Sequence, residues 1–289
     1  MVHSGGPPVT GRSPAENAQL ALLLEVAGTP KPGNVDRERD LPDLRFEHFL
    51  AGAVGAGEGI RAAEAGAPVG EAFETAVARM SDQSGGNTQF GALLLLVPLV
   101  RAGAEGELSR DGVRAVVEAT TVADAAAFYR AFEHVDVRVD EPAPDVDAPD
   151  VRRGADAVPD LRERDLTLFD VLAESAEVDG VAREWVGGFE RTFSVAEAVA
   201  AGDGPVSDRA ARAFLDQLAA EPDTHVAKQH GGGVARNVMV RAQEARDGND
   251  PALVDAFAEA LVGEGINPGT TADVVAAGLF VALERGVTV

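Results

Sequence analysis

The chain contains no cysteine, which excludes disulfides, thiolate zinc sites and a cysteine nucleophile. Lysine is almost absent as well, since only Lys31 and Lys228 occur and every other basic residue is arginine. No apolar run approaches the ~20 residues that a bilayer-spanning helix needs. The first twelve residues also lack the apolar core of a signal peptide. These absences predict a cytoplasmic protein that has no membrane partner.

Positive charge is scarce over the whole chain of 289 residues, in which 48 acidic residues outnumber 25 lysines and arginines for a net charge of −23. A field of that sign repels nucleic acid and anionic membranes, so neither is expected as a partner. Abundant surface carboxylate beside alanine, glycine and valine is typical of halophilic proteins. The acidity is therefore interpreted as a solvated surface.

Helix signals dominate the chain, and strand alternation is nearly absent. Ser13 and Glu16 form a capping box with proline between them, and Gly28 ends the apolar stretch that follows. Further helices are expected at 46–65, 69–80, 90–102, 121–134, 180–201, 207–220, 233–246, from 251 and from 270. The only strand candidate is 135–139. The pattern predicts an all-α fold in a single compact multi-helix domain.

The predicted domain spans 13–289 and follows a flexible N-terminus, 1–12. The proline- and aspartate-rich segment 141–157 is expected to be an exposed acidic loop. The clustered glycines of 52–59 predict close packing between helices. No internal repeat is present.

Four polar, glycine-containing segments separate these apolar helices, at 29–43, 81–91, 223–233 and 266–273. The last three directly precede a helix, where free N–H groups and the helix dipole favour anions. Both lysines lie in these segments. The pattern predicts a triphosphate site served by Lys31, Arg37, Lys228 and Arg236, and the proline-fixed segment 29–43 is expected to face the helix starts near Asn87 and Pro268.

Each segment also has a purely structural interpretation. Asn87 or Thr88 can act as a helix cap, and Thr270 with Asp273 matches a capping box. The two prolines after Thr29 can simply end a helix, and His225 and His230 are interpreted as surface or internally bonded residues. The P-loop, the GxSxG elbow and the HExxH motif are all absent.

At these residues the sequence resembles the triphosphoribosyl-dephospho-CoA synthase family. The family's opening motif matches Glu25-Val26, Thr29-Pro30-Lys31-Pro32-Gly33 and Val35-Asp36-Arg37. A second motif matches Asn87-Thr88-Gln89-Phe90-Gly91, and a late one matches Pro268-Gly269-Thr270-Thr271-Ala272-Asp273. Residues 41–45 lack the histidine and the second aspartate of the bacterial enzymes, which indicates an archaeal, haloarchaeal-like branch.

The resemblance implies a transferase that joins ATP to dephospho-CoA and releases adenine, with ATP as substrate and Mg²⁺ as cofactor. It implies catalytic and metal-binding roles for Asp36, Asp43 and Asp273. Nucleotide binding is expected from Lys31, Gly33, Asn34, Arg37, Asn87, Thr88, Gly91, Lys228, Gly269 and Thr270. The partners are a nucleotide and a CoA-type small molecule, and a homodimer is left open.

Two alternatives remain. The missing histidine and aspartate favour a related transfer to another acceptor, in a different cofactor pathway. The second alternative is that the chain is a helical protein that binds a nucleotide but catalyses no reaction. Adenine release from ATP separates the enzymes from the binding protein.

Overall fold

The computed structural model describes residues 11–289 except 138, 140–147 and 249, and its elements in this part of the chain are all helical. The first helices are α1 (Pro14–Ala27), α2 (Phe46–Gly55), α3 (Gly57–Glu64), α4 (Val69–Met80), α5 (Phe90–Ala104), α6 (Arg110–Glu118) and α7 (Val122–Ala131). A short 3₁₀ helix, η1 (Val151–Ala157), then leads to α8 (Val158–Glu163), α9 (Leu168–Ser175), α10 (Gly180–Gly187), α11 (Glu190–Ala201) and α12 (Val206–Ala220). The chain ends with α13 (Thr224–His230), α14 (Gly232–Asp247), α15 (Pro251–Glu264) and α16 (Gly269–Glu284). The predicted all-α single domain is confirmed.

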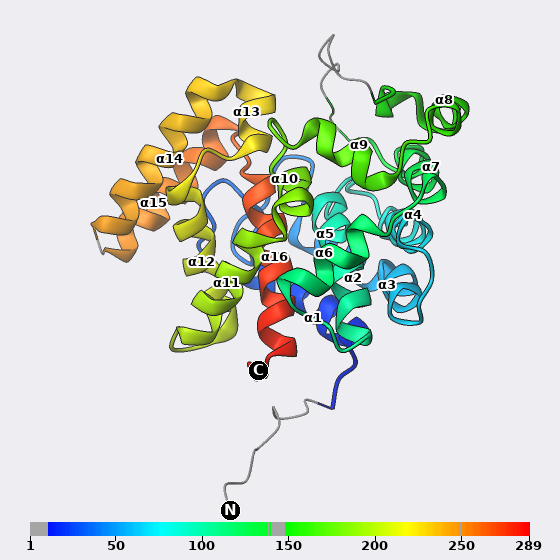
Figure 1. Cartoon of the computed structure of the whole chain (residues 1–289). Helices are drawn as coiled ribbons and strands as arrows, with labels where there is room; N and C mark the ends of the chain where they lie inside the picture. The colour runs from blue at the N-terminus through cyan, green and yellow to red at the C-terminus, as the bar shows by residue number, and fades with distance from the viewer. Residues whose placement is uncertain (1–10, 138, 140–147, 249) are drawn as a thin grey trace, which may run out of the picture.

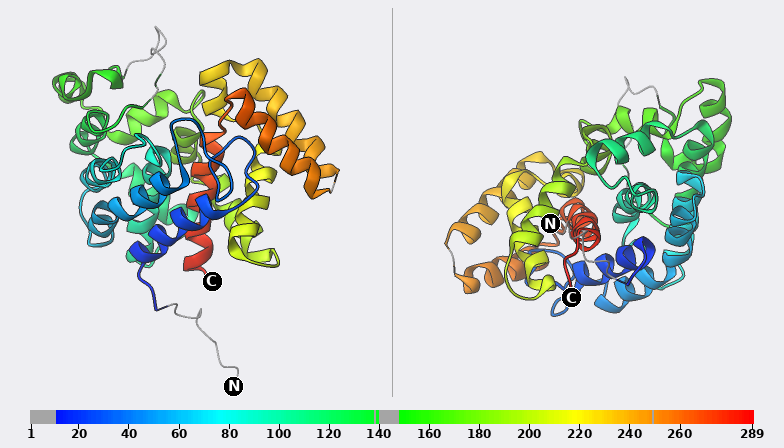
Figure 2. Two further views of the ribbon diagram at one scale, coloured as in Figure 1. Left: turned by 180° about the vertical axis from the view of Figure 1, so that it is seen from behind. Right: turned by 60° about the horizontal axis from the view of Figure 1, so that its bottom comes forward.

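Two helices that are apolar on nearly every side form the centre of the molecule. Helix α16 contacts α1, α5, α11 and α12, and α5 contacts α1, α3, α4 and α6. Figure 1 shows α16 in red at the middle, with α14 and α15 to one side and α3, α4 and α7 to the other. The tilted view in Figure 2 shows the same division. A helix without a polar face is stable only when it is surrounded by others, which explains this placement.

A proline in the middle of α5 sets the position of α10. Pro98 has no N–H, so the Leu94 carbonyl one turn earlier loses its helical partner. The indole of Trp185 on α10 donates to that carbonyl at 3.1 Å, and the ring is fully buried. An unpaired buried carbonyl costs ~1–3 kcal/mol, so this bond stabilises the contact between the two helices.

Several helix starts follow the sequence signals. Ser13 and Glu16 form the expected capping box at α1, and Thr121 with Asp124 does so at α7. Asp250 caps α15, where Pro251 is the first helical residue. Such a cap contributes ~1 kcal/mol to a helix.

Two expected helices are each divided. The helix predicted over 46–65 breaks at Ala56 into α2 and α3, and the one over 180–201 breaks where Gly188 and Phe189 both adopt left-handed backbone angles. The glycine prediction is confirmed, because a Cβ on Gly59 would lie 2.3 Å from a carbonyl oxygen of α4.

In the segment predicted as an exposed loop at 141–157, residues 151–157 form the helix η1 instead of a loop. Residues 152, 153, 155 and 156 are exposed as expected, whereas Gly154 and Ala157 are buried. Segments 1–10 and 140–147 lie outside the described residues. The described residues of 135–139 form no strand. No helix in the described ranges combines the length and apolarity needed to cross a bilayer.

Candidate active site

The segment between α1 and α2, which contains the first polar motif, is pressed against the segment that precedes α16. Gly33 has a left-handed φ of 75°, and a Cβ there would lie 2.2 Å from the carbonyl oxygen of Ile266. The Asn34 amide donates to the Asn267 side-chain oxygen at 2.8 Å. Glycine is therefore required at 33, because only glycine fits both the backbone angle and the contact.

Lys31 points into the protein interior. Its side chain is fully buried, and Nζ donates to Glu25 Oε1 at 2.5 Å and to Asn34 Oδ1 at 3.0 Å. The direct phosphate contact predicted for Lys31 is therefore replaced by an internal ion pair, since a buried ammonium needs a partner. Glu25, which the lysine holds, lines a cavity of about 240 Å³ beside α1. Burial raises the pKa of the Glu25 carboxyl, and the lysine charge opposes that rise.

Asp36 holds the loop together. Its Oδ2 accepts from the Thr29 hydroxyl at 2.9 Å, the Lys31 N–H at 3.0 Å and Arg39 at 3.2 Å, while Oδ1 accepts from the Glu38 N–H at 2.8 Å. Arg39 continues to Asp255 and Glu259 on α15. With these bonds made and no exposed surface, Asp36 lines neither that cavity nor a larger one of about 540 Å³ next to it.

The other charged residues predicted in this loop point elsewhere. Arg37 is half exposed and lies 3.9 Å from Asp208, and Asp43 is exposed. Arg236 is exposed on α14. Asp36, Asp43 and Asp273 therefore do not converge on a metal site, and no group of three or more possible metal ligands occurs among the described residues.

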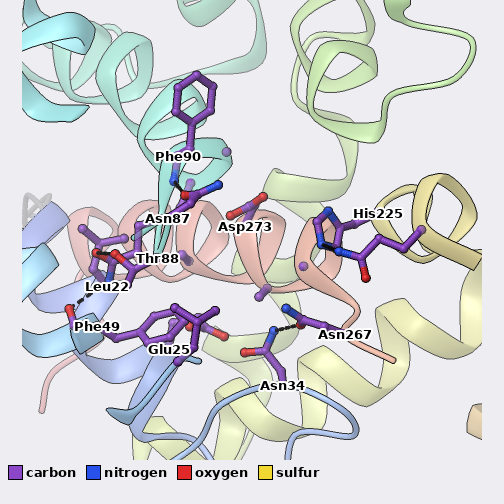
Figure 3. A pocket seen from close by; sticks show the side chains of 18 of the residues that line it. Leu22, Glu25, Asn34, Phe49, Asn87, Thr88, Phe90, His225, Asn267 and Asp273 are labelled. Atoms are coloured by element: carbon purple, nitrogen blue, oxygen red, sulfur yellow. Dashed lines mark hydrogen bonds between the residues drawn. The ribbon is translucent and has the colours of Figure 1, made fainter. Parts of the chain in front are cut away.

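The helix starts do converge. A cavity of about 240 Å³, here called the polar chamber, lies between α1, α13 and the first turns of α5 and α16. Figure 3 shows Asp273 on α16 between Asn87 and His225, with Asn34 and Asn267 below it. Of the predicted site residues, it brings together Asn34, Asn87, Thr88, Gly91, Gly269 and Asp273. Side-chain amides are prominent in its lining: Asn34, Asn87, Gln89, Gln229 and Asn267.

A second cavity of about 540 Å³, here called the large chamber, adjoins the polar chamber. Its wall is largely apolar and includes the clustered rings of Phe90, Phe128 and Phe132. Phe132 meets Phe90 at a tilt and Phe128 edge-on, with ring centroids 4.9 Å and 5.2 Å apart. The predicted residues Lys228 and Thr270 line it, and it shares five residues with the polar chamber: Asn87, Phe90, Gly91, His225 and Asp273.

Asp273 is the acidic residue of that shared wall. Its carboxylate lies against the start of α5, where the Ala92 N–H donates to it. Burial raises the pKa of Asp273 well above its usual range, and the negative charges of Glu25 and Asp223 raise it further. The Ala92 bond acts in the opposite direction without cancelling the rise. Asp273 can therefore carry a proton under conditions where an exposed aspartate has lost its own.

The capping box expected for Thr270 and Asp273 is wrong. Helix α16 begins at Gly269 with Pro268 as its cap residue, and no side chain caps it. The two residues thus lie within the helix and project to the cavities. Asp223 fixes this end instead, because its Oδ2 accepts from the Thr271 N–H at 2.8 Å and hydroxyl at 2.7 Å.

Lys228 is the only lysine or arginine among the described residues that line either chamber. It pairs with Asp179, whose other oxygen caps α10 at Val181 and Ala182. Burial alone would raise the pKa of Asp179, but the Lys228 charge and the two N–H bonds hold it below its usual range. The pair is partly exposed to the cavity, so Lys228 is accessible to an anion.

Sequence reasoning assigned no role to Glu25, His225, Gln229 or Asn267, all of which line the polar chamber. His225 is half-buried against Gly269 and bonded to Gln229, and His230 is exposed, so each matches one of the two expected environments. A signal did exist for two of these residues. Glu25 belongs to the first motif, and His225 lies in the polar segment 223–233, two residues after Asp223, the cap residue of α13.

Comparison with known proteins shows the family of the chain. The model of the CitG family, ATP:dephospho-CoA triphosphoribosyl transferase, matches residues 11–288. The chain therefore belongs to this family and is a transferase. A search of curated proteins gave no match.

A crystal structure from Archaeoglobus fulgidus, provisionally described as a triphosphoribosyl-dephospho-CoA synthase, is similar over 82% of this chain and 99% of its own, with a TM-score of 0.69 and 23% identity. That likeness shows the fold. The archaeal branch indicated by residues 41–45 stays a prediction.

Proposed function

We propose that this chain transfers the triphosphoribosyl group of ATP to the 2′-hydroxyl of dephospho-CoA and releases adenine. The observation that carries the proposal is the position of Asp273, a carboxyl with a raised pKa in the wall shared by two chambers. The reaction breaks one bond at the anomeric carbon of ribose and forms another on its other face. A reacting carbon beside Asp273 has one chamber for the leaving base and one for the incoming acceptor.

The polar chamber suits adenine. Its side-chain amides offer both donors and acceptors to a purine edge, and Phe49 and Phe90 offer apolar surface to its faces. No lysine or arginine lies among its described lining residues, which fits a neutral base better than a phosphate. Adenine bound there would therefore stay in a chamber of complementary chemistry when its bond to the ribose breaks.

The large chamber suits the phosphates and the acceptor. Asn87, Gly91, Lys228 and Thr270, four of the residues predicted to bind nucleotide, line it. A phosphate can take the place of the Asp179 carboxylate at the Lys228 ammonium, which is a compact charge with three donors. The clustered phenylalanines and neighbouring aliphatic side chains provide the apolar wall that the pantetheine arm of dephospho-CoA would contact.

Mg²⁺ enters this scheme with the nucleotide, as part of the substrate. The described lining of the two chambers includes the acids Glu25, Asp136, Asp150, Glu174, Glu177, Asp179 and Asp273. Two like unit charges at 4 Å repel by ~4 kcal/mol at an effective dielectric constant of 20. Magnesium on the triphosphate removes much of that repulsion, so MgATP should bind far more tightly than free ATP.

The test is adenine release, measured by chromatography, from MgATP with and without dephospho-CoA at several KCl concentrations. Adenine that appears only when dephospho-CoA is present supports the proposal. Adenine that requires a different acceptor would assign the chain to a related transfer. MgATP binding without adenine release under any condition would identify a nucleotide-binding protein and contradict the proposal.

A further inference from the structure

The wall shared by the two chambers contains a second group suited to proton transfer. Of the five shared residues, only Asp273 and His225 have side chains that can gain and lose a proton. An imidazole changes its charge near pH ~6.5, which makes histidine the side chain best suited to exchange protons near neutrality. His225 is also the only histidine among the described residues that line either chamber.

One carboxylate ties together the helices that carry these two groups. Asp223 Oδ1 accepts from the Val226 N–H at 3.0 Å and caps α13, while its Oδ2 accepts from Thr271 at the start of α16. Asp223 is 3% exposed, so these bonds are shielded from water. His225 and Asp273 therefore project from two helix starts whose relative position is fixed.

Two contacts orient the imidazole itself. The ring lies against the first residue of α16, where a Cβ on Gly269 would be 3.3 Å from its carbons. The ring Nε2 lies 2.7 Å from the side-chain amide nitrogen of Gln229, one turn further along α13. That nitrogen can only donate, so the contact holds Nε2 as the unprotonated, basic nitrogen of the neutral ring.

We propose that His225 is a catalytic residue of the proposed reaction and accepts the proton of the acceptor hydroxyl, while Asp273 donates a proton to the departing adenine. The acceptor oxygen forms the new bond to the anomeric carbon with its own electron pair, and the carbon–nitrogen bond breaks with its pair leaving on adenine. His225 gains one proton and Asp273 loses one, so transfer of a single proton from one to the other resets the site. The assignment rests on the proposed function.

The roles follow from the surroundings of each group. Asp273 lies among the carboxylates of Glu25, Asp223 and Asp179, which disfavour its ionised form and suit it to carry a proton. The imidazole is neutral above its own pKa and is then a base. This division predicts a bell-shaped dependence of kcat on pH, in which loss of the base lowers kcat on the acidic side and loss of the acid lowers it on the alkaline side.

The test compares His225→Asn with His230→Asn, a matched change at the exposed histidine that ends the same helix. General acid–base catalysis typically contributes ~10²–10⁴-fold, so kcat for adenine release should fall by ~100-fold or more in His225→Asn. The acidic limb of its pH profile should disappear, MgATP affinity should persist, and His230→Asn should behave as the wild type. Added imidazole should restore part of the rate to His225→Ala.

Two results would overturn the role of His225 alone: an unchanged kcat in His225→Asn, or a reduced kcat whose pH profile keeps both limbs. The second would show a residue that only shapes the pocket. A wild-type protein that releases no adenine in the presence of dephospho-CoA would overturn the proposed function and this role together, so the two failures are distinguishable.

Discussion

The carboxylate of Asp273 occupies the space beside the Gly91 backbone that a larger residue at 91 would fill, since a Cβ there would lie 2.1 Å from Oδ2. This contact joins the first turn of α5 to the first turn of α16, the two central helices. The absence of a side chain at 91 therefore determines where the acidic group of the shared wall lies.

Gly91→Ala should displace Asp273 and abolish most activity with little loss of stability, because the added methyl group meets a side-chain end that can rotate away. A misplacement of ~1 Å at a reacting group can cost ~100-fold in rate. Adenine release and thermal melting check the two parts. The matched control is Gly263→Ala in α15, where nothing lies within 4 Å of the new Cβ. It should keep full activity and gain ~0.5–1 kcal/mol of stability. Full activity in Gly91→Ala would contradict the position assigned to Asp273.

Lys228→Gln should weaken MgATP binding, because it removes the only lysine or arginine among the described residues that line the chambers. A hydrogen bond to a charged group contributes ~1.5–3 kcal/mol, which corresponds to ~10–100-fold in the dissociation constant measured by calorimetry. Arg236→Gln removes the same charge from an exposed position on α14 and should leave the affinity unchanged. Equal losses in both variants would show only a long-range effect of net charge.

Lys31→Met should destabilise the fold by ~3–5 kcal/mol, because it leaves the Glu25 carboxylate buried without its partner. Denaturant unfolding measures the loss. The double variant Glu25→Gln/Lys31→Met removes both charges and should recover a large part of it. If the double variant is as unstable as the single one, the lysine contributes through packing against Phe214 rather than through the ion pair.

Asp273→Asn should melt at a higher temperature than the wild type at neutral and alkaline pH. The folded-state pKa of Asp273 is raised above its ordinary value of 3.8, so ionisation weakens the folded state as pH rises through the folded-state pKa. Asparagine does not ionise and avoids that loss. The difference in melting temperature should shrink as the pH falls towards 3.8. A difference that is constant with pH would show that Asp273 is not in a charge-disfavouring environment.

The helical fold and the general place of the site could be predicted from the sequence. Continuous apolar stretches made α5 and α16 recognisable as central helices, and the polar segments at Asn87 and Gly269 do meet in one cavity. Local signals of this kind depend on neighbours within a turn or two. The pair Gly187-Gly188 did signal a break between α10 and α11, but the left-handed angle at Phe189 has no such local signal.

The side-chain partners within the site depend on residues distant in sequence. Lys31 looked like a phosphate ligand because its burial over the distant Phe214 is fixed only when α1 and α12 pack together. That burial leaves Glu25 of the same motif as its partner. Thr270 and Asp273 matched a capping box, but Asp223 on a different segment takes over the fixing of α16. When a residue from another segment takes the place of the expected hydrogen-bond partner, the local spacing of the sequence does not show it.

The most direct test of the central claim compares product formation by the wild type, Asp273→Asn and Asp43→Asn from MgATP and dephospho-CoA. Mass spectrometry would follow the triphosphoribosyl adduct, and chromatography would follow adenine in the same samples. Asp43 is exposed and lines neither chamber, so its variant should match the wild type. Adduct and adenine should appear in equal amounts with both of these proteins and fall by ~100-fold or more with Asp273→Asn. Equal product from all three proteins would contradict the assignment of the reaction to the wall between the two chambers.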